Sequence, residues 1–247
     1  MFKIITGFII LFSLYHGAEY MIMKENSVQG FLALQAVFFF MAWLLARWQG
    51  FKGYSAWGMV FETNALKNLL AGLLVGGFVY GLYFFTSLCF HFEEITSIPP
   101  PAKFLPAFLL FTFGTFFSSL SEDVLTRSYI FRHGSGKIPD GILLLFSSAL
   151  YVANHIYRLG DGYLVLLYLF VIGIFLMLAL MITKNIWLTL GLHWSGNILY
   201  QVTQQIIQTQ SHGSAAARLW LYIGFLLLLV PVTYILARFL RQTKTGS

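Results

Sequence analysis

Long apolar runs separated by short polar connections dominate the chain. A membrane-spanning helix needs about 20 mostly apolar residues, and eight segments meet this condition. The predicted spans cover residues 2–23, 27–46, 66–90, 104–131, 141–157, 162–183, 186–207 and 218–240. The pattern therefore predicts an all-α, multi-spanning transmembrane helix bundle of about eight helices, forming one integral-membrane domain over residues 1–247.

Composition supports an integral membrane protein. Hydrophobic residues make up 58% of the chain and charged residues only 10%, whereas soluble domains carry about 25% charged residues. The net charge is +6, but no basic run with interleaved aromatic residues is present, so we predict no nucleic-acid partner. The first apolar segment is too long for the core of a signal peptide, which predicts a retained first span.

The distribution of Lys and Arg predicts the orientation in the membrane. Cytoplasmic loops of membrane proteins carry an excess of these residues. With a cytoplasmic N-terminus, only Lys24, Lys103, Arg158 and Arg218 of the 15 lie on the opposite side. An even number of spans puts both termini on one side, so we predict that both termini are cytoplasmic. The absence of an ER-retrieval ending favours a bacterial inner membrane.

The third predicted span contains two pairs of glycines four residues apart, Gly72 with Gly76 and Gly77 with Gly81. Small residues at this spacing let two membrane helices approach closely. We favour packing within the chain over a dimerisation surface.

Three short polar clusters interrupt the apolar spans. They are Glu122-Asp123-Val124-Leu125-Thr126-Arg127, Tyr151-Val152-Ala153-Asn154-His155 and His193-Trp194-Ser195-Gly196-Asn197. A charge at the bilayer centre costs at least about 2.5–3.5 kcal/mol, so each cluster indicates either a function or compensating partners. At 1.5 Å per residue from the predicted cytoplasmic ends, Glu122 lies about 14 Å deep and His193 about 10 Å deep. His155 comes out at about 21 Å, which helix tilt or a later helix start would correct.

Each cluster has a structural alternative to a catalytic role. Asp123 and Arg127 are four residues apart and can form an ion pair. This pair would leave Glu122 free for catalysis, or all three residues could form one structural ion network. A lone histidine such as His155 is also a common packing residue.

The third cluster is equally open. His193 and Asn197 share a helix face, where they offer two hydrogen-bond donors to an oxyanion. The same two side chains could instead hold neighbouring helices together.

Together, the three clusters resemble the CAAX-protease and bacteriocin-processing family, which includes the type II CAAX prenyl endopeptidases. The family motifs are Glu-Glu-x-x-x-Arg, Phe-x-x-x-His and His-x-x-x-Asn or Asp. Here they stand, in the same order, as Glu122-Asp123-x-x-x-Arg127, Tyr151-x-x-x-His155 and His193-x-x-x-Asn197. Asp replaces the second Glu and Tyr replaces Phe. The resemblance covers residues 104–207, which we expect to hold the catalytic core helices.

The resemblance implies a glutamic-type intramembrane endopeptidase that uses an activated water. Its expected partners are membrane lipid and a protein or peptide substrate with a membrane-embedded or lipidated segment. Glu122 and His155 would activate the water, and His193 and Asn197 would stabilise the oxyanion. The expected supporting residues are Asp123, Arg127 and Tyr151.

Two alternatives stay open at this point. No cofactor is the favoured expectation, but Glu122, His155 and His193 could supply a two-His, one-carboxylate zinc site with an open position for water. A non-catalytic membrane protein, such as a bacteriocin immunity or scaffolding protein or a small transporter, is the other alternative. Convergence of the candidate residues on one cavity would favour hydrolysis.

Overall fold

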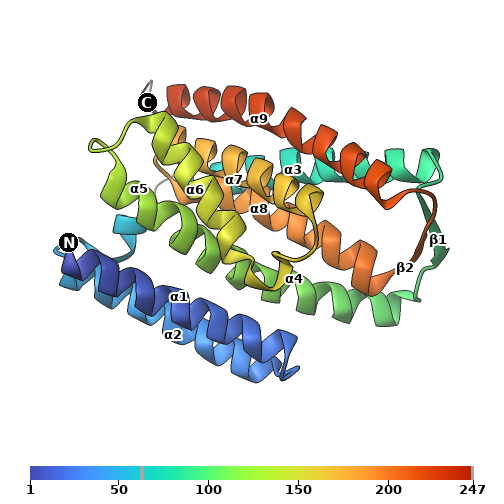
Figure 1. The fold of residues 1–247 in the computed structure, drawn as a ribbon, viewed down its shortest axis with the longest axis horizontal. Helices are drawn as coiled ribbons and strands as arrows, with labels where there is room; N and C mark the ends of the chain where they lie inside the picture. The colour runs from blue at the N-terminus through green and yellow to red at the C-terminus, as the bar shows by residue number, and fades with distance from the viewer. Residues whose placement is uncertain (62–63, 246–247) are drawn as a thin grey trace.

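The computed structural model describes residues 1–61 and 64–245, and nearly all of the regular structure there is helical (Figure 1). The predicted domain of residues 1–247 includes residues 62–63 and 246–247, which lie outside the described residues. The helices are α1 (Phe2–Met23), α2 (Val28–Trp48), α3 (Asn64–Cys89), α4 (Pro101–Asp123), α5 (Tyr129–Gly134), α6 (Asp140–Asn154), α7 (Tyr163–Thr183), α8 (Ile186–Gln201) and α9 (Ala215–Thr245). Short 3₁₀ helices cover Gly53–Trp57 and Ile156–Arg158, and π-helical turns cover Val124–Ser128 and Val202–Ile206.

A helix occupies each of the eight predicted spans, which confirms the expected all-α, multi-spanning bundle. Among the described residues, six helical segments are long and apolar enough to cross a membrane, and one of them joins α4 through a π-helical turn to α5. Of the other two, α6 has 15 residues and measures about 22 Å, less than the roughly 30 Å hydrocarbon core. α8 continues into the π-helical turn that ends at Ile206 and is long enough with it, but this segment is not among the six that meet the condition on apolarity. Six of the eight predicted spans are therefore full spans by length and apolarity.

The two central helices of the bundle are α7 and α8 (Figure 1). α8 packs against α3 and α4, while α7 packs against α6 and α9. The helices α1 and α2 form a separate pair at one side. Residues 186–193 of α8 are all buried, so the polar side chains of this helix face protein rather than lipid.

The beginning of α1 and the end of α9 lie at the same end of the bundle, on the left in Figure 1. An even number of membrane crossings requires this arrangement. That this end faces the cytoplasm stays a prediction. The opposite end carries an antiparallel ribbon of β1 (Glu93–Ser97) and β2 (Gln208–Ser211). The sequence pattern did not predict this ribbon.

Glycines bring α3 and α8 into close contact. A Cβ atom at Gly72 would lie 2.6 Å from the carbonyl oxygen of Leu188 and 2.8 Å from the amide nitrogen of Leu192. By contrast, a Cβ atom at Gly77 or Gly81 would meet no heavy atom within 4 Å. The first glycine pair therefore serves packing within the chain, while the second leaves an open surface.

We expect Gly72→Ala to destabilise the folded protein by about 1–3 kcal/mol, the usual cost of overpacking. The atoms that a methyl group would meet are backbone atoms of α8, which move only if the helices separate. Gly77→Ala is the matched control, and it should be neutral or slightly stabilising because Ala favours helix more than Gly does. Thermal unfolding in detergent micelles measures the difference, and equal melting temperatures would contradict the close packing.

Candidate active site

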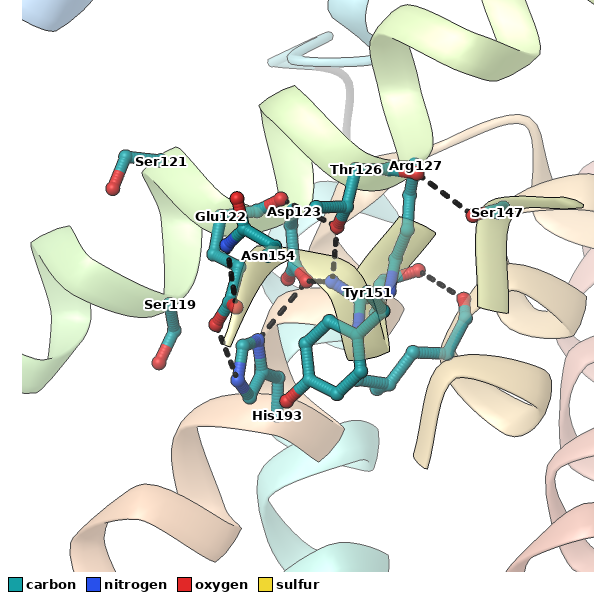
Figure 2. Close-up of polar contacts among 12 residues, drawn as sticks. Ser119, Ser121, Glu122, Asp123, Thr126, Arg127, Ser147, Tyr151, Asn154 and His193 are labelled. Atoms are coloured by element: carbon teal, nitrogen blue, oxygen red, sulfur yellow. Dashed lines mark hydrogen bonds and ion pairs between the residues drawn. The ribbon is translucent and has the colours of Figure 1, made fainter. Parts of the chain in front are cut away.

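Two buried carboxylates lie at the C-terminal end of α4 (Figure 2). Glu122 is 4% exposed and Asp123 is 0% exposed. The π-helical turn Val124–Ser128 follows them directly, and wide turns of this kind are frequent at functional sites. The Thr126 hydroxyl donates to the Glu122 carbonyl (2.7 Å), and the Ser147 hydroxyl donates to the Thr126 carbonyl (2.8 Å). These bonds satisfy backbone oxygens where the regular helical pattern is interrupted.

Side chains from two other helices surround the Glu122 carboxylate. The amide of Asn154, the last residue of α6, donates to Oε1 (3.1 Å). Nδ1 of His155 lies 3.7 Å from the same oxygen, and Nε2 of His193 lies 3.5 Å from Oε2. Both imidazole distances exceed those of a direct hydrogen bond, so the two rings contact Glu122 without bonding to it directly.

The position of His155 resolves the mismatch in depth that the sequence predicted. The continuous helical segment formed by α4, the π-helical turn and α5 ends at Gly134. Glu122 lies 12 residues, about 18 Å, from that end. α6 begins at Asp140 and crosses the bundle obliquely (Figure 1). Two differences from the predicted spans bring His155 level with Glu122: α6 is tilted, and α5 ends at Gly134 rather than at residue 131.

His193 contacts both carboxylates. Its Nδ1 lies 3.0 Å from Oδ1 of Asp123, while its Nε2 faces Glu122. The same oxygen of Asp123 accepts a hydrogen bond from Nη1 of Arg127 at 2.5 Å. An ionised carboxylate only accepts hydrogen bonds, so Nδ1 of His193 carries a hydrogen. Asp123 thus fixes the orientation of this ring and joins it to the arginine.

The guanidinium of Arg127 is completely buried. It also donates to the Thr126 hydroxyl (3.1 Å), and its central carbon lies 4.3 Å from the centre of the Tyr151 ring. The same tyrosine ring packs edge-on against His155, with 4.6 Å between ring centres. The Tyr151 ring therefore lies between the guanidinium of Arg127 and the imidazole of His155.

Asn197 lies one helical turn beyond His193, but its amide is engaged with another helix. Its Nδ2 donates to the hydroxyl of Ser119 (2.9 Å), a buried residue one turn before Glu122 on α4. The structure thus brings His155 and His193 to one carboxylate and leaves Asn197 against a neighbouring hydroxyl. For Asn197 to act with His193 as a second donor to an oxyanion, its amide has to break the bond to Ser119 and donate to the substrate oxygen instead.

The helices that meet at this carboxylate all lie in one stretch of the chain. Residues 103–199 match the family model of the type II CAAX prenyl endopeptidase Rce1-like proteins. The Rce1-like match spans 97 of the 247 residues (103–199) and contains every residue of the site described above. It confirms the resemblance drawn from the three motifs and supports a CAAX-type intramembrane protease as the general class. No curated protein and no solved structure matches the chain.

The motifs did not predict two contacts of this site. Asn154 directly precedes the motif histidine His155, and its side chain is buried with a bond to Glu122. Ser119 lies three residues before Glu122, on the same helix face. A polar residue next to a motif residue inside an apolar span was a usable signal for Asn154. Ser119 resembles the many hydroxyls that bond within their own helix, so its role could not be read from the sequence.

The side chains proposed as zinc ligands do not fit a metal site as they are placed. Among the described residues, no group of three His, Cys, Asp or Glu side chains has the geometry to hold a metal ion. The nitrogen of His155 nearest Glu122 is Nδ1, which lies 2.8 Å from the Tyr151 carbonyl oxygen. A carbonyl oxygen accepts a hydrogen bond, so this nitrogen carries a hydrogen and has no lone pair for a metal.

We expect Asn154→Ala to lower kcat by about 10–150-fold, because the loss of one hydrogen bond to a charged group costs about 1.5–3 kcal/mol. Asn154→Asp should be more severe, since it replaces the donor with a second negative charge beside Glu122. Ser148→Ala is the matched control on the same helix, because the Ser148 hydroxyl donates to the Leu144 carbonyl of its own helix. Equal turnover of all three variants and the parent would show that the Asn154 bond does not position Glu122.

Proposed function

We propose that the protein is an intramembrane endopeptidase in which Glu122 and His155 activate a water molecule. The observation that carries this proposal is the division of charge between the two acids. Asp123 is paired with Arg127, whereas the neighbours of Glu122 are an amide and two imidazoles. A carboxylate without its own cation, next to imidazole, is suited to accept a proton.

The proposed reaction begins with a water held between Glu122 and His155. As its oxygen attacks the carbonyl carbon of the scissile peptide bond, the water gives a proton to Glu122. Negative charge then develops on the former carbonyl oxygen, where Nε2–H of a protonated His193 and the amide of Asn197 donate hydrogen bonds. Collapse of this intermediate breaks the C–N bond, and the proton held by Glu122 passes to the departing amine.

Asp123 has a definite part in this scheme. Its carboxylate accepts a hydrogen bond from Nδ1 of His193, so it orients the ring with Nε2 toward Glu122. Arg127 holds Asp123 in place from the other side. The arrangement follows the logic of catalytic triads, in which a buried carboxylate orients and stabilises an imidazole.

The proposed substrate is a protein or peptide with a membrane-embedded or lipidated segment, because the site lies among membrane-spanning helices. The proposed location is a bacterial inner membrane with both termini in the cytoplasm, and nucleic acid is not among the proposed partners. Convergence of His155 and His193 on Glu122 favours hydrolysis over a purely scaffolding or immunity role.

Comparative proteomics of membranes tests the proposal even while the substrate is unidentified. Cells that express Glu122→Ala should accumulate a full-length precursor that cells with the parent protein cleave. Glu25→Ala, which removes an exposed acid at the end of α1, is the control and should leave cleavage intact. Identical sets of peptide termini in all three strains would contradict a protease.

We further propose that the reaction needs no metal. Purified protein should then contain no stoichiometric zinc and should keep its activity after treatment with a chelator. Loss of activity on chelation, with recovery on adding zinc, would favour the zinc alternative built on Glu122, His155 and His193.

A further inference from the structure

A polar cavity lies at the end of the bundle where α1 begins and α9 ends. Its volume is about 360 Å³, and its walls come from the 3₁₀ helix Gly53–Trp57, the π-helical turn with α5, and the connection between α7 and α8. Ser128, Arg132 and Lys184 are among the residues that line it. None of these three belongs to the proposed catalytic machinery.

Two cations contribute to the lining of this cavity. The guanidinium of Arg132 lies 4.1 Å from the centre of the Phe51 ring, and the ammonium of Lys184 lies 4.4 Å from that of Phe131. Within residues 1–61 and 64–245, neither cation forms an ion pair. Burial lowers the pKa of the Lys184 ammonium, and the charge of Asp140 only partly opposes this effect. Both side chains are exposed, and an anion in the cavity would give each cation a partner of opposite charge.

Ser128 provides an independent sign of a missing ligand. The residue is 2% exposed, and its hydroxyl has no hydrogen-bond partner in the part of the chain that the structure describes. Buried hydroxyls are nearly always hydrogen-bonded, since an unsatisfied one costs free energy. Ser128 and the two cations line the same cavity, so an anion there would lie near both positive charge and a residue with an unpartnered hydroxyl.

The cavity lies where the membrane-spanning segments end. Two candidate spans finish at Gly134 and Thr183, and the lining residues Ser135 and Lys184 follow them directly. That level corresponds to the headgroup region of a bilayer, where phosphate groups are concentrated. Basic pockets between membrane helices are known binding sites for anionic lipid headgroups.

We propose that this cavity binds the phosphate group of an anionic membrane lipid. Arg132 and Lys184 supply the positive charge, and the Ser128 hydroxyl donates a hydrogen bond to a phosphate oxygen. A soluble phosphate ion offers the same oxygen atoms, but the position at the ends of the spans favours a lipid. This binding site is separate from the proposed protease chemistry and does not depend on it.

Native mass spectrometry of the full-length protein tests the proposal. The protein is reconstituted in phosphatidylcholine nanodiscs with increasing amounts of phosphatidylglycerol, and the retained lipid is counted. We expect saturable retention of one phosphatidylglycerol, weakened about tenfold or more in Arg132→Gln/Lys184→Gln because charge-assisted hydrogen bonds are lost. Arg47→Gln removes an exposed cation at the same end of the bundle and should change retention less than twofold.

Ser128→Ala separates ligand binding from folding. In lipid-free detergent its melting temperature should equal or exceed that of the parent, because the hydroxyl removed has no partner. Its retention of phosphatidylglycerol should nevertheless fall by about threefold to tenfold. Equal retention by the parent, Ser128→Ala and the double variant would overturn the proposal. Saturable binding of inorganic phosphate without competition from phosphatidylglycerol would overturn the lipid assignment.

Discussion

Replacing Glu122 by Gln should slow peptide cleavage by about 10²–10⁴-fold, the range attributed to a general base. Gln keeps the shape of the side chain and can still accept the hydrogen bond from Asn154, but it cannot take a proton from water. Turnover of an identified precursor by purified protein measures the effect. The melting temperature in detergent should stay close to that of the parent protein, because no ion pair with Arg127 is lost.

A second variant shows whether Glu122 and His155 work as a unit. His155→Ala alone should also cause a large loss, since the water would lose one of its two partners. Combining it with Glu122→Gln should add little, because residues that act together in one step give non-additive losses. Independent, multiplying losses would contradict a shared water, and full activity of Glu122→Gln would remove Glu122 from the chemistry.

Replacing Arg127 by Met should destabilise the folded protein by about 3–5 kcal/mol, the usual cost of breaking a buried ion pair. The side chains of Arg127 and Asp123 are both 0% exposed, so the carboxylate left behind would have no access to water. Chemical unfolding in micelles measures the loss. Arg158→Met is the matched control, because the Arg158–Asp161 pair is 39% and 44% exposed and such pairs contribute about 0.2–1 kcal/mol.

The origin of this loss can be tested by removing the second charge. Asp123→Asn in the Arg127→Met background should restore part of the stability, since the uncompensated charge disappears. No recovery would mean that the guanidinium stabilises the fold through its contact with the Tyr151 ring rather than through charge.

The apolar pattern and the three motifs predicted the helices and the segment that holds the site. Helix length and apolarity are local properties, so the positions of α1 to α9 could be derived from the chain itself. The motif spacing correctly put Asp123 and Arg127 on one helix face. The π-helical turn after Asp123 was not predictable, because its widening depends on hydroxyl groups such as that of Ser147, which belongs to another helix.

Contacts between helices depend on rotation and tilt, which the sequence pattern does not encode. The early end of α6 at Asn154 gives that side chain its contact with Glu122, and the tilt of α6 brings His155 to the same level. Asn197 shares a face with His193 as expected, yet its partner is Ser119, which no motif indicates. The general location of the site could thus be predicted, but its detailed bonding could not.

The small β-ribbon has a consequence for how a substrate could reach Glu122. β1 leads into α4 through Pro99, Pro100 and Pro101, and β2 follows α8 and its π-helical turn. The paired strands therefore act as a clasp that joins the ends of the two helices carrying Glu122 and His193. Because the clasp limits separation of α4 and α8 at that end, a substrate segment has to enter along the flank of this helix pair or from the opposite end.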